Sequence, residues 1–357
     1  MKYIFIFIFL LTAPISIYAR QNFQISGKVL NGKGEPIQSA TVFLDGSQKS
    51  TSTNTKGEYV LTGIQSGTYQ LVVNMLGYQS QKENVLVQQE SSILNVTLKE
   101  KAIILKEVLI GKNSSREQFM KIFIKNFLGE SENAKSCKIL NTNIIDFSSK
   151  NKLLEAITDD FLIIENKNLG YKIRYLLRNF LHNGNTETTS YDGECIFEDL
   201  PGSPEQQKKW KANRLAAYQG SWMHYLRSLY QNNAEQQGFF TYKTIGSGIP
   251  ATVDQRPVLT QTFVQHADST FILFRSKERL YAVYDADQFI RKKKPMKTPD
   301  MGDYLSRNGT IVKLFLDKAV IDGKGSIVDY RSFLLNGFWS GKRIGDQLPF
   351  EYLPAEN

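Results

Sequence analysis

Short apolar runs separated by turn signals fill residues 22–110, and this spacing restricts the fold more than any other feature of the chain. About seven runs favour strands and recur every ~8–12 residues, without the apolar period of a helix. Residues 40–44 and 67–73 are two of these runs, and residues 31–36, with two glycines and a proline, are a turn cluster. Many short strands joined by regular turns are typical of a β-sandwich. We therefore expect a seven-strand sandwich at residues 22–110.

Six short motifs occur in this stretch in a specific order. They are Ile25-Ser26-Gly27-Lys28-Val29, Gly34-Glu35-Pro36-Ile37, Ala40-Thr41-Val42, Thr53-Asn54-Thr55-Lys56-Gly57-Glu58-Tyr59, Gly67-Thr68-Tyr69 and Gly77-Tyr78. In this order they resemble the carboxypeptidase-like regulatory domain, a transthyretin-like sandwich common at the N-termini of envelope proteins, including TonB-dependent receptors. The resemblance implies an accessory module, in which the glycines and Pro36 serve folding rather than chemistry.

The name of this family does not imply peptidase activity here. Metallocarboxypeptidases hold zinc with a His-x-x-Glu pair and further ligands. None of His182, His224 and His266 is followed by Glu at that spacing. The resemblance therefore implies the accessory domain without the peptidase, and we expect no metal ion and no cofactor.

The first 19 residues have the pattern of a secretory signal peptide. Lys2 is followed by an apolar run over residues 3–11, and Ala19 is a small residue at a cleavage position. An uncleaved anchor is the alternative, but the run is short for a membrane span. The missing cysteine near Ala19 excludes a lipoprotein anchor. We expect export to the periplasm or a peripheral association with the outer membrane.

Composition and charge indicate an ordinary globular protein of about two domains. Of 357 residues, 41% are hydrophobic and 22% charged, and the net charge is +9. This excess of positive charge is modest and we expect the chain to be exported, so we expect no nucleic-acid partner. The basic run 291–294 predicts a solvated loop, with a contact to an anionic glycan as the alternative. Cys137 and Cys195 either form a disulfide or remain two buried thiols.

Residues 113–357 mix helix and strand patterns, which predicts a larger α+β domain. A short amphipathic helix begins at Ser114 or Ser115 and should dock on the strands that follow. The longest helical pattern runs from Pro204 to about Gln231, and strands with meander-like antiparallel connections follow Gly238. The predicted fold class is α+β: the sandwich, followed by a mainly antiparallel β domain with one long and one short helix.

The long helical pattern carries the candidate binding residues. At about 100° per residue, a bulky stripe lies on one face, whereas small residues, His224 and Arg227 lie opposite. One interpretation is a polar notch for an anionic or sugar ligand. The alternative is close packing of a second element, with His224 hydrogen-bonded there. Together with the segment 337–352, this pattern resembles the uncharacterised region that trails regulatory domains in exported proteins. The candidate ligand-binding residues are Tyr218, Ser221, His224, Arg227, Trp339 and Arg343.

These features favour an exported, non-enzymatic protein of the cell envelope. Residues 113–357 would dock on a partner protein or a glycan, with the sandwich as an accessory module. One alternative is a hydrolase of unfamiliar type in residues 113–357, with Asp285 and Asp287 as candidate carboxylates; a Ser221–His224 nucleophile pair lacks an orienting acid. Another is a component associated with an outer-membrane barrel or related to TonB receptors. The sequence does not set the oligomeric state.

Overall fold

The computed structural model describes residues 22–88, 90–101, 113–246, 252–285 and 308–354. The expected signal peptide at residues 1–19, the basic run 291–294 and Asp287 lie outside these described residues. Within the described stretches, no helix is both long and apolar enough to cross a membrane.

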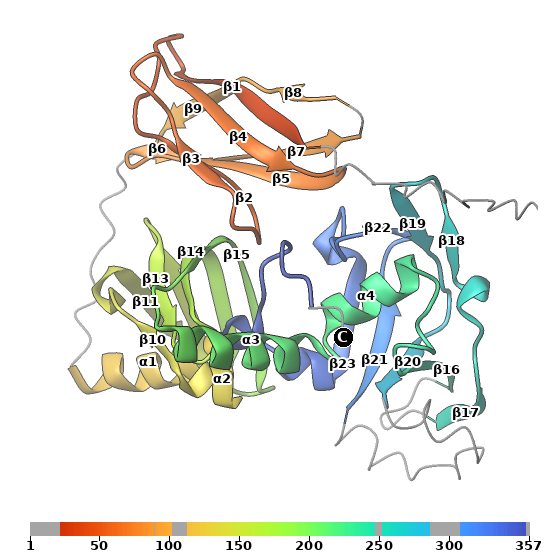
Figure 1. The fold of residues 1–357 in the computed structure, drawn as a ribbon. Helices are drawn as coiled ribbons and strands as arrows, with labels where there is room; N and C mark the ends of the chain where they lie inside the picture. Colours follow the sequence, from red (N-terminus) through yellow and green to blue (C-terminus); the bar gives the residue numbers. More distant parts are fainter. Residues whose placement is uncertain (1–21, 89, 102–112, 247–251, 286–307, 355–357) are drawn as a thin grey trace, which may run out of the picture.

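Three parts pack against one another in the molecule (Figure 1). The sandwich (residues 22–101) lies above the middle part (113–218) and the C-terminal part (222–354). The chain ends in a closing segment, residues 338–354, that returns between the middle and C-terminal parts.

The N-terminal stretch folds into the expected sandwich, but its described residues form nine strands rather than seven. One sheet has the order β4-β1-β9-β6, with β8 paired to β1, and the other has the order β3-β2-β5-β7. Buried Ile25 and Val29 lie four residues apart on β1, as one face of a strand requires. The strands are β1 (Phe23–Asn31), β2 (Thr41–Leu44), β3 (Ser50–Ser52), β4 (Glu58–Ile64), β5 (Gly67–Asn74), β6 (Tyr78–Gln79), β7 (Gln81–Val87), β8 (Ser92–Ile93) and β9 (Val96–Glu100).

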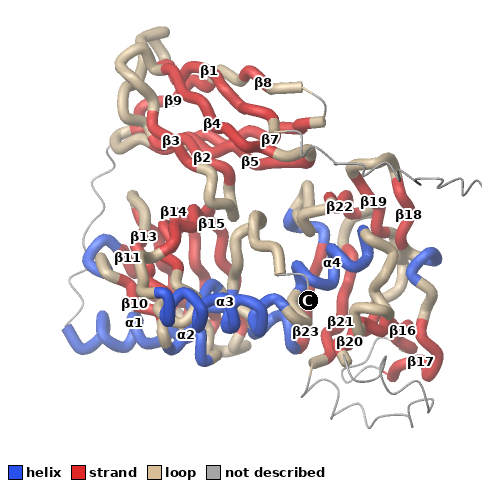
Figure 2. The backbone as a smooth tube through the Cα atoms, viewed as in Figure 1, coloured by secondary structure: helices blue, strands red, loops and turns tan. Residues whose placement is uncertain are grey.

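Gly57 shows why the turn motifs suit this fold. Its φ is +71°, and its N–H donates to the Asn54 carbonyl at 2.9 Å. A Cβ at this position would lie 2.6 Å from the Val29 carbonyl oxygen, so only glycine fits. In Figure 2 the described residues of the sandwich are strands and loops alone.

The middle part is an antiparallel sheet covered by helix α1. The sheet has the order β10-β13-β14-β12-β11, and β15 pairs along β14. Phe123 and Phe127 of α1 pack edge-on against Phe180 and Tyr175 of β14, with ring centroids 4.9 and 5.0 Å apart. This confirms the expected docking helix. The elements are α1 (Asn113–Leu128), α2 (Glu132–Lys135), β10 (Cys137–Ile139), β11 (Ile145–Lys150), β12 (Leu153–Thr158), β13 (Leu162–Asn166), β14 (Tyr171–Asn183), β15 (Thr188–Asp199) and α3 (Pro204–Tyr218), with a 3-10 turn η1 (Thr142–Ile144).

The C-terminal part has two antiparallel sheets around helix α4. One sheet has the order β17-β16-β20-β21-β23, and the other has the order β18-β19-β22. Tyr225 of α4, Phe239 and Trp339 are buried in their shared core. The elements are α4 (Trp222–Tyr230), β16 (Phe239–Ile245), β17 (Thr252–Pro257), β18 (Val264–His266), β19 (Phe271–Phe274), β20 (Leu280–Tyr284), β21 (Gly309–Leu314), β22 (Ala319–Asp322) and β23 (Phe333–Gly337), with 3-10 turns η2 (Thr260–Thr262), η3 (Tyr330–Ser332), η4 (Phe338–Gly341) and η5 (Ile344–Asp346).

The single long helix predicted from Pro204 to Gln231 is wrong, because it divides into α3 and α4. Gly220 has a φ of +72°, which ends the first helix. Ser221 then caps the second, since its hydroxyl accepts a hydrogen bond from the His224 N–H at 3.1 Å. The bulky side chains that the pattern placed on one helix face are therefore divided between α3 and α4.

The cysteines are two free thiols, so the disulfide alternative for Cys137 and Cys195 is wrong. Cys137 lies on β10 and Cys195 on β15, and the strand order β10-β13-β14-β15 separates them. Three strand spacings amount to roughly 14 Å, twice the distance that a disulfide allows between Cα atoms.

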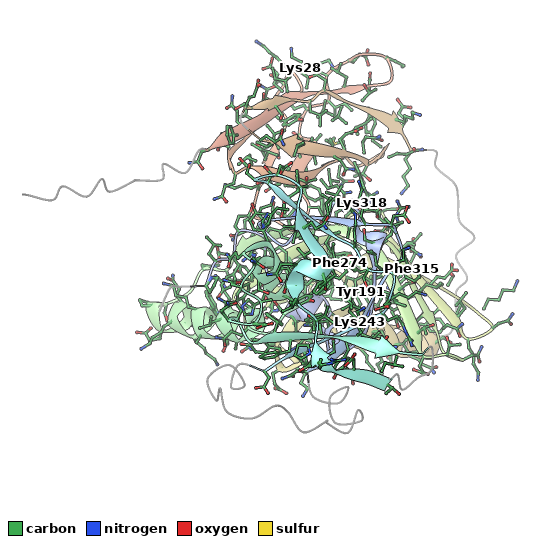
Figure 3. All side chains as sticks on the ribbon, turned by 90° about the vertical axis from the view of Figure 1, so that its right-hand side faces the viewer. Lys28, Tyr191, Lys243, Phe274, Phe315 and Lys318 are labelled. Carbon is green, nitrogen blue, oxygen red and sulfur yellow. The ribbon has the colours of Figure 1, made fainter. Side chains whose placement is uncertain are left out.

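The sandwich docks on the free edge of β15. The Gly46 N–H donates to the Cys195 carbonyl and the Phe197 N–H donates to the Ser47 carbonyl, both at 2.9 Å. Beside this extension of the sheet lies an apolar interface cluster of Phe43, Val72, Phe161, Leu176 and Ile196. In Figure 3, Lys28 lies on the opposite, outer side of the sandwich.

Candidate functional site

Four of the predicted binding residues gather where α3 meets α4. Trp339 donates through its indole N–H to the Gly220 carbonyl at 2.7 Å, and the Tyr218 ring lies 4.6 Å from the His224 ring. Ser221 caps α4 at the same place. The structure thus brings Trp339 beside three neighbouring residues that lie more than a hundred positions earlier in the sequence.

His224 has both ring nitrogens occupied. Nδ1 accepts a hydrogen bond from the Gly220 N–H at 3.2 Å, so Nε2 carries the proton and donates to Gln237 Oε1 at 3.1 Å. Burial lowers the pKa of His224, which keeps the ring neutral. This arrangement corresponds to the interpretation in which small residues permit close packing around a hydrogen-bonded histidine.

Arg227 holds the closing segment. Its guanidinium donates to the carbonyls of Lys324 (2.8 Å), Tyr352 (2.6 Å) and Phe350 (3.0 Å). Phe350 in turn donates its N–H to the Gly46 carbonyl of the sandwich at 2.9 Å. Arg227 therefore fixes the segment on which the sandwich rests.

A central cavity of about 460 Å³ lies where the sandwich, the middle part and the C-terminal part meet. This volume is within the usual range of small-ligand sites. Ser221, Trp339 and Arg343 of the predicted set line it, whereas Tyr218, His224 and Arg227 are not among its lining residues. The aromatic residues of the wall are Tyr69, Tyr175, Phe197, Trp222, Trp339 and Phe350.

Asp346 is the least satisfied polar group of this wall. The residue is 8% exposed, and its Oδ1 accepts a hydrogen bond from Asn133 Nδ2 at 2.9 Å. Lys342 Nζ lies 3.8 Å from the same oxygen. Among the described residues, Oδ2 has no hydrogen-bond partner although it is buried. Because Oδ2 is inaccessible as well as unpaired, it is a local desolvation cost rather than a contact point for a ligand.

Asp45 brings a second carboxyl group to the cavity from the turn after β2. Its Oδ1 accepts a hydrogen bond from the Cys195 N–H at 2.8 Å. Desolvation raises the pKa of Asp45 to about 7, and the hydrogen bond from Cys195 offsets only part of this rise. Asp45 can therefore accept or donate a hydrogen bond near neutral pH.

A family comparison identifies the module that supplies Asp45. Residues 25–110 match the model of one protein family over most of the sandwich. They are a CarboxypepD_reg-like domain.

Comparison with solved structures gives partial matches of low score. The cohesin–X-dockerin complex of Acetivibrio cellulolyticus is 21% identical, with a TM-score of 0.21 over 30% of this chain and 76% of that chain. The major pilin subunit of Bacillus cereus is 11% identical, with a TM-score of 0.20 over 50% of this chain and 69% of that chain. 3-Chlorocatechol 1,2-dioxygenase of Rhodococcus opacus is 9% identical, with a TM-score of 0.20 over 23% and 60% of the two chains. No curated protein matches the chain.

The CarboxypepD_reg-like domain supplies charged side chains to its interface as well as residues of the cavity wall. Its Lys82 forms an ion pair with Glu194 of β15, which is fully buried and also accepts from Arg178 Nε at 2.9 Å. The ammonium nitrogen of Lys324 lies 4.0 Å from the centroid of the Tyr69 ring on β5. The domain is therefore joined to both other parts by charged contacts beside the cavity.

A second cavity of about 690 Å³ opens between the edge of the CarboxypepD_reg-like domain and the C-terminal part. Tyr69, Lys324 and Phe350 line both cavities and separate them. Arg227 lines this second cavity, but its guanidinium is engaged by the three carbonyls described above.

The described part of the chain has no cluster of metal ligands, and the candidate carboxylate Asp285 lies away from both cavities. No group of three His, Cys, Asp or Glu side chains there could hold a metal ion. Asp285 follows β20, where its N–H donates to the Gly238 carbonyl at 2.8 Å, and it lines neither cavity.

Sequence reasoning missed Asp45 and Asp346 as site residues. Asp45-Gly46 has the composition of an ordinary turn, and Asp346 lies in the closing segment that was noted only for a resemblance. The sequence signal for Asp346 is its position shortly after the candidate residues Trp339 and Arg343. Its unpaired oxygen is a property of the tertiary structure.

Proposed function

We propose that this protein is an exported, non-enzymatic binding protein of the cell envelope, and that its ligand occupies the central cavity. The ligand is a glycan or a segment of a partner protein. Export is inferred from the signal-peptide pattern of residues 1–19, with the periplasm or an association with the outer membrane as the location.

The cavity between the three parts is the observation that carries this proposal. Its wall combines six aromatic residues with a few polar groups, as binding sites for small molecules usually do. The CarboxypepD_reg-like domain supports the site directly, because its turn after β2 both extends β15 and closes the cavity. This gives the accessory module a physical role in binding.

The experiment is capture of envelope components by the tagged mature chain and by a variant with a filled cavity. Val328 lines the cavity and is 38% exposed, so Val328→Trp blocks the space without entering a core. Val60→Trp is the matched control, because Val60 is exposed on β4 and lines neither cavity.

The proposal predicts that Val328→Trp lowers the affinity for the captured component by at least about tenfold, whereas Val60→Trp leaves it unchanged. Equal capture by both variants would place binding outside the central cavity. Turnover of the captured component by the mature chain would contradict a non-enzymatic role.

A further inference from the structure

The register of the sandwich shows which backbone groups of β7 bond to its neighbour. β7 is the last strand of the sheet β3-β2-β5-β7, so among the described strands it pairs along β5 alone. Asp45, directly after β2, donates its N–H to the Gln70 carbonyl of β5 at 3.0 Å. Gln70 therefore faces β2, and its neighbours Tyr69 and Leu71 face β7. The residues of β7 that bond to β5 are Gln81, Glu83, Val85 and Val87.

The alternate residues Lys82, Asn84 and Leu86 point their backbone N–H and C=O groups away from the sheet. No hydrogen bond joins these backbone groups to another described residue. Asn84 and Leu86 are exposed, Leu86 at 49%. Residues two apart on a strand lie about 7 Å from each other, and each of them presents one donor and one acceptor. This row of groups matches the backbone of another extended chain, which is how peptides bind to sheet edges.

β7 reaches from the middle part to the C-terminal part, in the layer of the sandwich that faces them (Figure 1). Near its start, Lys82 forms an ion pair with Glu194 of β15. Near its end, Leu86 lies opposite Thr68, whose N–H donates to Asp322 of the C-terminal part at 3.2 Å. A strand added beside β7 would therefore lie next to both of these parts as well as the sandwich.

Asn84 lies between these two contacts and lines the central cavity. It is opposite Gln70 of β5, which lines the same cavity. Directly opposed residues of paired strands turn their side chains to the same face of the sheet. The residue that an added strand places opposite Asn84 would thus turn its side chain toward the cavity. The edge of β7 and the cavity therefore suit a single ligand.

We infer that this ligand is an extended segment of a partner protein, which pairs its backbone with Lys82, Asn84 and Leu86 and places one side chain in the central cavity. This inference rests on the proposed function and selects a protein segment over a glycan as the ligand class.

The test uses the envelope component that the tagged mature chain captures. If this component is a protein, its sequence is synthesised as short overlapping peptides, and their affinity for the full mature chain is measured by calorimetry. Each binding peptide is remade with N-methyl groups on alternate residues, in two frames. An added strand bonds to β7 along one of its edges only, so one frame removes its donors and the other faces solvent.

Two variants of the chain test the same edge from the other side. Asn84→Pro removes an outward N–H that bonds to no residue of β5, so the pairing with β5 is kept. Asn84→Ala is the matched control, because it removes the same side chain but keeps the N–H. The third measurement is amide hydrogen exchange of the wild type by NMR, with and without the peptide.

We expect one methylation frame to weaken binding by at least about tenfold and the other to leave it within about twofold. Asn84→Pro should weaken binding by at least about tenfold, whereas Asn84→Ala should not. In the wild type, the peptide should slow exchange at Lys82, Asn84 and Leu86. Glu83 and Val85 are bonded to β5 already and should change little.

Equal effects of the two methylation frames would overturn the inference on wild-type protein alone, whether or not Asn84→Pro folds. Unchanged exchange at Lys82, Asn84 and Leu86 would overturn it as well. A dimer of the free mature chain that Asn84→Pro dissociates would assign the edge to a second copy of the chain, and this too would overturn it.

Capture of a glycan, or failure of every peptide to bind, would also overturn the inference. If Val328→Trp still lowered capture in that case, the proposed function would stand with a different kind of ligand. If Val328→Trp had no effect either, both would fail.

Discussion

At the scale of single residues, the raised pKa of Asp45 should make the stability of the fold depend on pH. Its carboxyl group is desolvated beside Cys195, and the charges that face it are Glu194 and Lys82. Its pKa rises from 3.8 to about 7 on folding. The folded chain therefore holds this proton between about pH 4 and about pH 7, where the unfolded chain has lost it. The stability that the protonated group contributes is present at the acidic end and is lost as pH rises.

We predict that Asp45→Asn removes this pH dependence. Asparagine stays neutral and keeps an acceptor for the Cys195 N–H. The free energy of unfolding of the wild type, relative to the variant, should fall by up to about 1.4 kcal/mol for each pH unit across this window. Urea unfolding from pH 4.5 to pH 8 measures this difference. Parallel curves for the two proteins would show that Asp45 does not titrate there.

At the residue scale, part of the candidate set from the sequence lies at the cavity. Ser221, Trp339 and Arg343 line the central cavity, and their role in ligand binding stays a prediction. Asp45 and Asp346 were not expected, because a single aspartate in a turn has no local pattern that distinguishes a site residue. Their role depends on neighbours more than a hundred residues away in the sequence.

At the scale of elements, the break between α3 and α4 positions one corner of the cavity. The predicted start at Pro204 is right, because Ser203 and Gln206 form a capping box there. The break was missed because Gly220 and Ser221 were interpreted as small residues on one helix face. Together they are a helix end followed by a helix cap, which a periodicity argument alone does not separate.

Gly220→Ala should destabilise the fold by about 1–3 kcal/mol, the usual range for forcing a side chain into a left-handed backbone. The φ of +72° opposes the substitution, and the new Cβ would meet the Tyr284 ring at 2.6 Å. Chemical denaturation measures the loss. Gly341→Ala is the control, because a Cβ there meets no atom within 4 Å. An equal effect of the two substitutions would argue against a strained break at Gly220.

At the scale of the whole molecule, the sandwich is joined to the rest by one apolar cluster, by a sheet extension and by charged contacts such as the Lys82–Glu194 ion pair. Its fold was predictable from local turn motifs, since each motif specifies its own turn. Its docking was not, because Phe43 and Ile196 have the apolar character of any sandwich or sheet core. Which apolar residues face another part is decided only when the three parts pack.

We predict that Phe161→Ser separates the unfolding of the sandwich from that of the middle part. Phe161 packs edge-on against Phe43 with ring centroids 5.6 Å apart, and it lies outside the internal core of the sandwich. The loss of about 3 kcal/mol expected for a buried phenylalanine should turn one calorimetric transition into two. Phe315→Ser is the control, since Phe315 is 58% exposed on the C-terminal part. A single transition in the Phe161 variant would mean that the hydrogen bonds of Gly46 and Ser47 and the charged contacts suffice for coupling.

The central claim is that one ligand contacts all three parts at once. Hydrogen exchange of the mature chain, with and without the component it captures, tests this most directly. The account predicts simultaneous protection of residues 68–70, 193–197 and 342–350, which line the central cavity in the sandwich, the middle part and the closing segment. Protection confined to one of these parts, or to an outer strand such as β17, would contradict it.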